Sequence, residues 1–147
     1  MKTSNKIFEV QTKGEFDFVD LTSEIEKFCE ESQIKNGLLN IQTFHTTCPL
    51  FLNENEPLLL EDFKNHLEKL SPKNLNYNHN DFTRRTVNVC QDECKNGHSH
   101  CQALHLPSNL TLNIVAGKLQ LGQWQRIFLV ELDKPKLRKT QTQILGE

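Results

Sequence analysis

The sequence lacks a long apolar run and an excess of positive charge. No apolar stretch approaches the roughly 20 residues that a membrane-spanning helix needs, so we expect no contact with a membrane. The formal net charge is −2, and without a basic excess we expect no nucleic-acid partner. The N-terminal residues hold no apolar signal-peptide core and no small-residue cleavage site, so no signal peptide is expected.

The sequence contains cysteine, but the number of cysteines does not predict a set of disulfides. The five cysteines are odd in number and no secretory signal accompanies them. We therefore expect reduced thiols and a cytoplasmic location. A chain of 147 residues has the size of one domain and can bury a core without disulfides or structural metal. Residues 1–147 are expected to form that single domain.

Alternation of apolar and polar residues predicts most of the regular structure as β-strands. The expected strands are Ile7–Gln11, Phe16–Leu21, Leu38–Phe44, Leu50–Leu52, Leu110–Val115, Lys118–Leu121, Gln125–Leu132 and Lys139–Leu145. Helices and strands do not alternate regularly along the chain. This order favours an α+β fold of about seven mostly antiparallel strands with two to three helices over a doubly wound sheet.

Three segments predict helices. The first opens with a capping box at Ser23–Glu26 and is expected to stop at Asn36-Gly37. The second spans Glu56–Leu70, with Asn55 as its N-cap. Gln102–Leu106 predicts a third, short helix.

The tripeptide His98-Ser99-His100 is the strongest local signal for a functional site. If this segment is extended, side chains two residues apart project to the same side, and both imidazoles can reach one ion or one anion. On a helix they would diverge by about 200°. A metal needs at least a third protein ligand, for which His79 and His45 are candidates. Solvated surface histidines are the alternative interpretation. The polar stretch Ser71–Gly97 shows no periodicity and predicts a functional loop or lid.

The cysteines allow two further interpretations. Cys90, Cys94, His98 and Cys101 carry groups that bind zinc well, but their spacing does not match the common zinc-binding patterns. A structural zinc site is therefore an alternative. Cys48 is a candidate thiol nucleophile.

Two polar or aromatic motifs lie away from the histidines. Asn53-Glu54-Asn55-Glu56 opens the second helix, where it caps the helix or directs Glu54 into a site as a base or outer ligand. Trp124, the only tryptophan, follows Gly122 and is interpreted as a core or subunit-interface aromatic.

Taken together, these motifs resemble the YjbQ family, whose members are often described as secondary thiamine-phosphate synthases. The resemblance runs from about Leu38 to Glu147. Its carriers are His45-Thr46-Thr47, Asn53-Glu54-Asn55, Tyr77-x-His79, Asn96-Gly97-His98-Ser99-His100, Ser108–Leu112, Gly117–Gln125 and Gly146-Glu147.

The resemblance implies a β-sandwich of about seven strands that assembles as a homotrimer. It also implies a pocket where four histidines gather around a metal or an anion, namely His45, His79, His98 and His100. The family's label implies the joining of a pyrimidine diphosphate to a thiazole phosphate, which we expect here as a weak thiamine-phosphate synthase activity at most.

These residues predict a metal-dependent enzyme that acts on a small phosphorylated molecule. His79, His98 and His100 are expected to bind a divalent metal such as zinc. The expected catalytic residues are His45, Glu54 and His100, and the expected substrate contacts are Thr46, Thr47, Asn53 and Trp124. The alternative is a non-catalytic trimeric protein that binds a metabolite or a metal through the same histidines.

Overall fold

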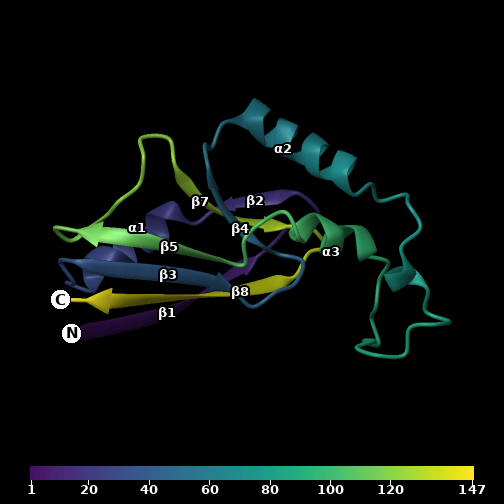
Figure 1. The fold of residues 1–147 in the computed structure, drawn as a ribbon, viewed down its shortest axis with the longest axis horizontal. Helices are drawn as coiled ribbons and strands as arrows, with labels where there is room; N and C mark the ends of the chain where they lie inside the picture. Colours follow the sequence, from purple (N-terminus) through teal and green to yellow (C-terminus); the bar gives the residue numbers. More distant parts are fainter.

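The computed structural model describes all 147 residues and shows eight strands in two antiparallel sheets with three α-helices (Figure 1). The five-stranded sheet has the order β1 (Lys2–Gln11), β8 (Leu137–Gly146), β3 (Gly37–Thr43), β5 (Asn109–Val115) and β6 (Lys118–Leu119). The three-stranded sheet has the order β2 (Asp17–Asp20), β7 (Arg126–Glu131) and β4 (Leu50–Asn53). The expected α+β fold with antiparallel strands is confirmed.

The helices are α1 (Thr22–Glu31), α2 (Pro57–Leu70) and α3 (Gly97–Ala103), with a short 3₁₀ turn, η1, at Asn78–Asn80. None of them combines the length and apolar character that crossing a membrane requires. Apart from η1, the segment between α2 and α3 has no regular structure, as predicted, and it projects beyond the end of the sheets (Figure 1).

Strand β7 lies between two hydrophobic cores, and this position accounts for its apolar sequence. Ile127 and Leu129 belong to the larger core, between the two sheets and α1. Phe128 and Val130 belong to a second core that includes Leu67 of α2. Because both faces of the strand are covered, the four central residues of β7, Ile127–Val130, are all apolar and buried.

Several predicted helix boundaries are wrong, because contacts outside the helices set them. The backbone N–H of Thr22 donates to Asp20 Oδ1, so the Ser23 capping box does not form. Helix α1 ends at Glu31, and Gly37 instead opens β3. The cap of α2 is Glu56 rather than Asn55, since its carboxylate accepts the first free N–H groups of the helix.

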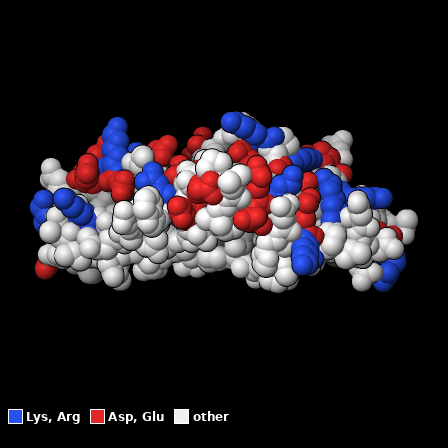
Figure 2. Space-filling view, turned by 90° about the horizontal axis from the view of Figure 1, so that it is seen from above, with Lys and Arg blue, Asp and Glu red and all other residues white.

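The outer face of the five-stranded sheet is almost without charge. Among the outward-facing side chains of β1, β8, β3 and β5, only Glu9 and Lys139 are charged, and they pair with each other at 2.8 Å. The same face and its margin expose large apolar side chains: Ile7, Leu38, Phe44, Val115, Leu137 and Leu145. In Figure 2 the charged side chains gather toward the upper side of the molecule, and the left and middle parts of the lower side are nearly white.

A buried ion pair joins the two sheets. Glu131 of β7 and Arg138 of β8 make two hydrogen bonds, from Arg138 Nε and Nη2 to the two carboxylate oxygens. The hydroxyl of Thr12 also donates to Glu131, at 2.8 Å, and Arg138 donates to the hydroxyl of Thr47 at 3.1 Å. Nearly every polar atom of the pair is therefore satisfied inside the protein, as a buried charge requires.

Arg138→Met should lower the free energy of unfolding by about 3–5 kcal/mol, because it leaves the buried carboxylate of Glu131 without its counter-charge. The measurement is urea unfolding at neutral pH. Lys139→Met is the matched control, since its ion pair is exposed and is worth less than about 1 kcal/mol. Equal losses in the two variants would show that the buried pair does not hold the sheets together.

Candidate functional site

The two neighbouring histidines lie on α3, so the extended conformation in which both imidazoles could reach one ion does not form. Helix α3 begins at Gly97, five residues before the predicted start at Gln102, and contains both imidazoles. On a helix, side chains two residues apart point in different directions. His98 and His100 accordingly have different neighbours, and one ion is not shared between them in this arrangement.

His79 and His100 form an imidazole pair. Gly97 allows the η1 segment to pack on α3, because a Cβ at this position would lie 2.5 Å from Cβ of Tyr77. The backbone N–H of Gly97 donates to Asn80 Oδ1 at 2.9 Å. The two imidazole rings are then 4.6 Å apart, centroid to centroid.

The surroundings of the imidazole pair favour a neutral His100 and leave one nitrogen of His79 without a partner. Burial lowers the pKa of His100, and the neighbouring His79 lowers it further. Nε2 of His79 is buried and has no hydrogen-bond partner. A buried polar atom without a partner is costly, so this nitrogen is where we expect a ligand.

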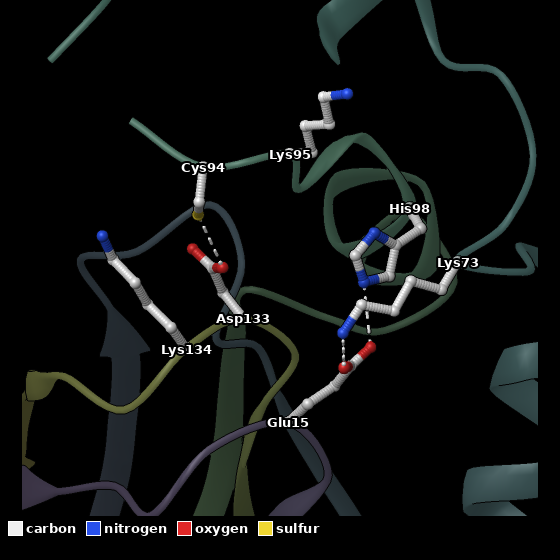
Figure 3. A pocket seen from close by; sticks show the side chains of 7 residues that line it. All are labelled: Glu15, Lys73, Cys94, Lys95, His98, Asp133 and Lys134. Atoms are coloured by element: carbon white, nitrogen blue, oxygen red, sulfur yellow. Dashed lines mark hydrogen bonds and ion pairs between the residues drawn. The ribbon is translucent and has the colours of Figure 1, made fainter. Parts of the chain in front are cut away.

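His98 faces a different space, a hollow of about 380 Å³ (Figure 3). Its Nε2 lies 2.9 Å from Glu15 Oε1, and the other carboxylate oxygen of Glu15 accepts from Lys73 at 2.6 Å. We call this the lysine hollow; it is lined by His98 together with Glu15, Lys73, Cys94, Lys95, Asp133 and Lys134. Lys95 makes no ion pair or side-chain hydrogen bond within the chain.

Asp133 joins the lysine hollow to the end of β7. Burial tends to raise the pKa of Asp133, but hydrogen bonds from Lys136 and Asn96 outweigh it and hold the pKa well below its ordinary value. The Cys94 thiol donates to the same carboxylate at 3.3 Å. Asp133 is therefore a fixed negative charge. Its charge raises the pKa of His100, but burial and His79 outweigh this effect.

Two of the predicted residues at 45–47, His45 and Thr47, already have hydrogen-bond partners within the protein. Nε2 of His45 accepts the backbone N–H of Lys139 at 2.8 Å. Burial lowers the pKa of His45, and the positive charge of Arg138 acts in the same direction. The hydroxyl of Thr47 accepts from Arg138, and Thr46 is exposed. Through Thr47, this segment binds Arg138 of the buried ion pair.

The remaining predicted residues lie at the other end of β7. We call this place the acidic hollow; it has a volume of about 440 Å³, and its lining includes Asp20, Glu54, Glu56, Gln123, Trp124 and Arg126. Asn53 ends β4 next to it. Arg126 and Asp133 are seven positions apart along the chain, or about 23 Å at roughly 3.3 Å per residue of extended chain. Within the chain, Glu54 and Trp124 therefore lie far from the histidines.

No three His, Cys, Asp or Glu side chains of the chain come together in a group that could hold a metal ion. This includes the four zinc-binding candidates Cys90, Cys94, His98 and Cys101, of which Cys90 is exposed. Cys48 is fully buried, and burial raises the pKa of its thiol to about 12, which is unsuitable for a nucleophile.

Sequence reasoning missed the charged residues that surround His98. Glu15 and Lys73 come from separate loops, and no local pattern connects them to α3. A signal did exist for Glu131 and Asp133, two acidic residues at the end of a strongly apolar strand. Acidic side chains are seldom buried unless they are paired, so this position could have been identified as a special one.

The chain is similar to proteins of one family over its whole length. The family model described as "UPF0047 protein YjbQ-like" matches residues 6–147. A UPF0047 protein of Methanothermobacter thermautotrophicus is 32% identical over 147 residues, covering 100% of this chain and 95% of the relative. The YjbQ protein of Salmonella typhimurium is 33% identical over 113 residues, covering 76% of this chain and 75% of that protein.

Solved structures are also similar to this chain over its whole length. A YbjQ-like protein of unknown function from Sulfolobus solfataricus has a TM-score of 0.88 and 33% identity, with 99% of each chain covered. A hypothetical protein from Aeropyrum pernix has a TM-score of 0.83 and 30% identity, with both chains fully covered. The chain belongs to the UPF0047/YjbQ family.

Proposed function

We propose that this protein is a metal-dependent enzyme that acts on a small phosphorylated molecule at the end of β7. The observation that carries the proposal is the imidazole pair, with rings 4.6 Å apart and with a buried, unpartnered nitrogen on His79. Weak thiamine-phosphate synthase activity belongs to the same proposal as the first reaction to assay.

The imidazole pair suits a divalent metal such as zinc. Metal-binding imidazoles must be neutral, and the lowered pKa of His100 keeps this side chain neutral at pH 7. His79 and His100 would hold the ion, which when bound acts as a Lewis acid toward a phosphoryl oxygen. Since the chain gathers no third such ligand, the remaining positions need groups from outside it.

The lysine hollow supports the choice of a phosphorylated molecule. Lys73, Lys95 and Lys134 are among the residues that line it, together with the carboxylates of Glu15 and Asp133 (Figure 3). Lys73 is paired with Glu15 and Lys134 with Asp92, which leaves the ammonium group of Lys95 unpaired. Lysine ammonium groups attract phosphate as point charges. In the proposed enzyme these residues bind and orient the phosphate while the imidazole pair faces the reacting end.

Association of copies, as a homotrimer, is part of the proposal. The outer face of the five-stranded sheet supports it, because it is flat, nearly uncharged and carries exposed apolar side chains such as Leu38 and Leu145. Charged residues are depleted at the centre of protein–protein interfaces, and an exposed apolar patch commonly marks one.

Non-catalytic binding of a metal or metabolite is the second candidate. It is favoured by the distance between Glu54, the expected base, and the imidazole pair within one chain. Incubation with phosphorylated metabolites separates the two. Metal-dependent release of phosphate or pyrophosphate supports the enzyme, whereas a ligand recovered unchanged, without turnover of any other, supports binding alone.

His79→Ala and His100→Ala should each weaken Zn²⁺ binding by more than about tenfold, since loss of even an outer-shell partner costs 10–100-fold. Isothermal titration calorimetry measures the affinity. His105→Ala is the control, because this exposed histidine follows α3 and lies outside the pair. Unchanged Zn²⁺ affinity in both test variants would rule out the imidazole pair as the metal site.

Inorganic pyrophosphate should raise the melting temperature of the protein, because a ligand that binds only the folded state stabilises it. The shift should shrink strongly in Lys95→Ala, which removes the unpaired ammonium group of the lysine hollow. Lys118→Ala, on β6 away from the hollow, should keep the full shift. Equal shifts in the two variants would place the phosphate elsewhere.

A further inference from the structure

A second hollow, of about 500 Å³, adjoins the lysine hollow and shares Lys73 and Lys95 with it. We call it the asparagine hollow, because its lining includes three asparagines, namely Asn76, Asn78 and Asn80. Its volume lies within the range of pockets that hold small molecules. The imidazole pair does not belong to its lining, so the asparagine hollow is a separate place on the molecule.

The side-chain amides of the asparagine hollow are free to bind a ligand. Asn76 and Asn78 make no side-chain hydrogen bond within the chain, and Asn80 uses only its amide oxygen, which accepts the backbone N–H of Gly97 at 2.9 Å. The NH₂ group of Asn80 is therefore left as a donor. An amide both donates and accepts, as a hydroxyl group does, so this lining suits a molecule with several hydroxyl groups rather than an apolar one.

The wall that carries these amides is held in place by the protein. The hydroxyl of Tyr77 donates to the backbone oxygen of Pro72 at 2.8 Å. The backbone N–H of Asn80 donates to the backbone oxygen of Tyr77, and a Cβ at Gly97 of α3 would lie 2.5 Å from the Cβ of Tyr77. Groups that are already in position lose little conformational entropy when a ligand binds, and this favours affinity.

Lys95 supplies a positive charge beside these amides. Its ammonium group makes no ion pair, and in Figure 3 the side chain points away from the carboxylates of Glu15 and Asp133. The one carboxylate of the asparagine hollow belongs to Asp81, whose Oδ1 already accepts two hydrogen bonds within its own turn. An unpaired ammonium group next to neutral amides fits a phosphate that is joined to a hydroxylated body.

We propose that the asparagine hollow binds a phosphorylated sugar, with the phosphate on Lys95 and the sugar hydroxyl groups on the amides of Asn76, Asn78 and Asn80. The phosphate part of this inference rests on the lysine hollow of the proposed function, whereas the sugar and its site are new. No metal ion takes part in this binding, and neither does the imidazole pair.

D-Ribose 5-phosphate and inorganic phosphate are the two probes, because they differ in the sugar. Isothermal titration calorimetry on the metal-free protein measures both affinities. Ribose 5-phosphate should bind at least about tenfold more tightly than inorganic phosphate, since each net hydrogen bond to a sugar hydroxyl raises the affinity severalfold.

Substitutions locate the sugar within the asparagine hollow. Asn78→Ala should weaken binding of ribose 5-phosphate by about threefold to tenfold, as expected for one lost hydrogen bond, and leave binding of inorganic phosphate unchanged. Asn74→Ala is the matched control, because this exposed asparagine of the same loop does not line the hollow. Lys95→Ala should weaken binding of both compounds. None of these side chains bonds within the chain, so the melting temperatures without ligand should equal that of the wild type.

The outcomes separate this inference from the proposed function. Equal affinities for the two compounds, both lowered in Lys95→Ala, would overturn the sugar site and leave the phosphate site intact. A loss of ribose 5-phosphate binding that is as large in Asn74→Ala as in Asn78→Ala would overturn the sugar site too. If neither compound binds, the phosphate site and the sugar site are both wrong, whereas the imidazole pair is tested independently by its Zn²⁺ affinity.

Discussion

Glu131 places a negative charge between the two sheets, and the guanidinium of Arg138 neutralises it there. The charge must stay paired, because an isolated carboxylate in this interior would be strongly unfavourable. Its second oxygen accepts the backbone N–H of Asp133, and this contact fixes the chain where it leaves β7. The position of Asp133, and through it Asn96 and α3, depends on this pair. The site is therefore built onto the most constrained part of the fold.

Local sequence pattern predicted the strands well because burial imposes it directly. Leu39 and Ile41 alternate with polar neighbours in β3, and the continuous apolar run of β7 reflects a strand covered on both faces. The ends of α2 were predicted to within one residue, but those of α1 and α3 and the capping residues were not. Asp20 and Glu56 supply the capping contacts where Ser23 and Asn55 were expected, and the choice among nearby polar side chains depends on how each loop approaches the helix.

The site was predicted in its residue types rather than in its arrangement. His79 and His100 come together as expected, but His98 turns away because α3 starts earlier than its sequence suggests. Its partners, Glu15 and Lys73, are distant in sequence and belong to no recognisable motif. Glu54 and Trp124 were assigned to the same pocket as the histidines. The structure places them at the other end of β7.

The imidazole pair, held by η1 and α3, is the feature on which the proposed function depends. A crystal structure of the protein grown with Co²⁺, with an anomalous difference map at the cobalt edge, tests this account most directly. If the proposed function holds, we expect one anomalous peak per chain, bound by His79 and His100. A peak away from the imidazole pair, or no peak, would contradict it.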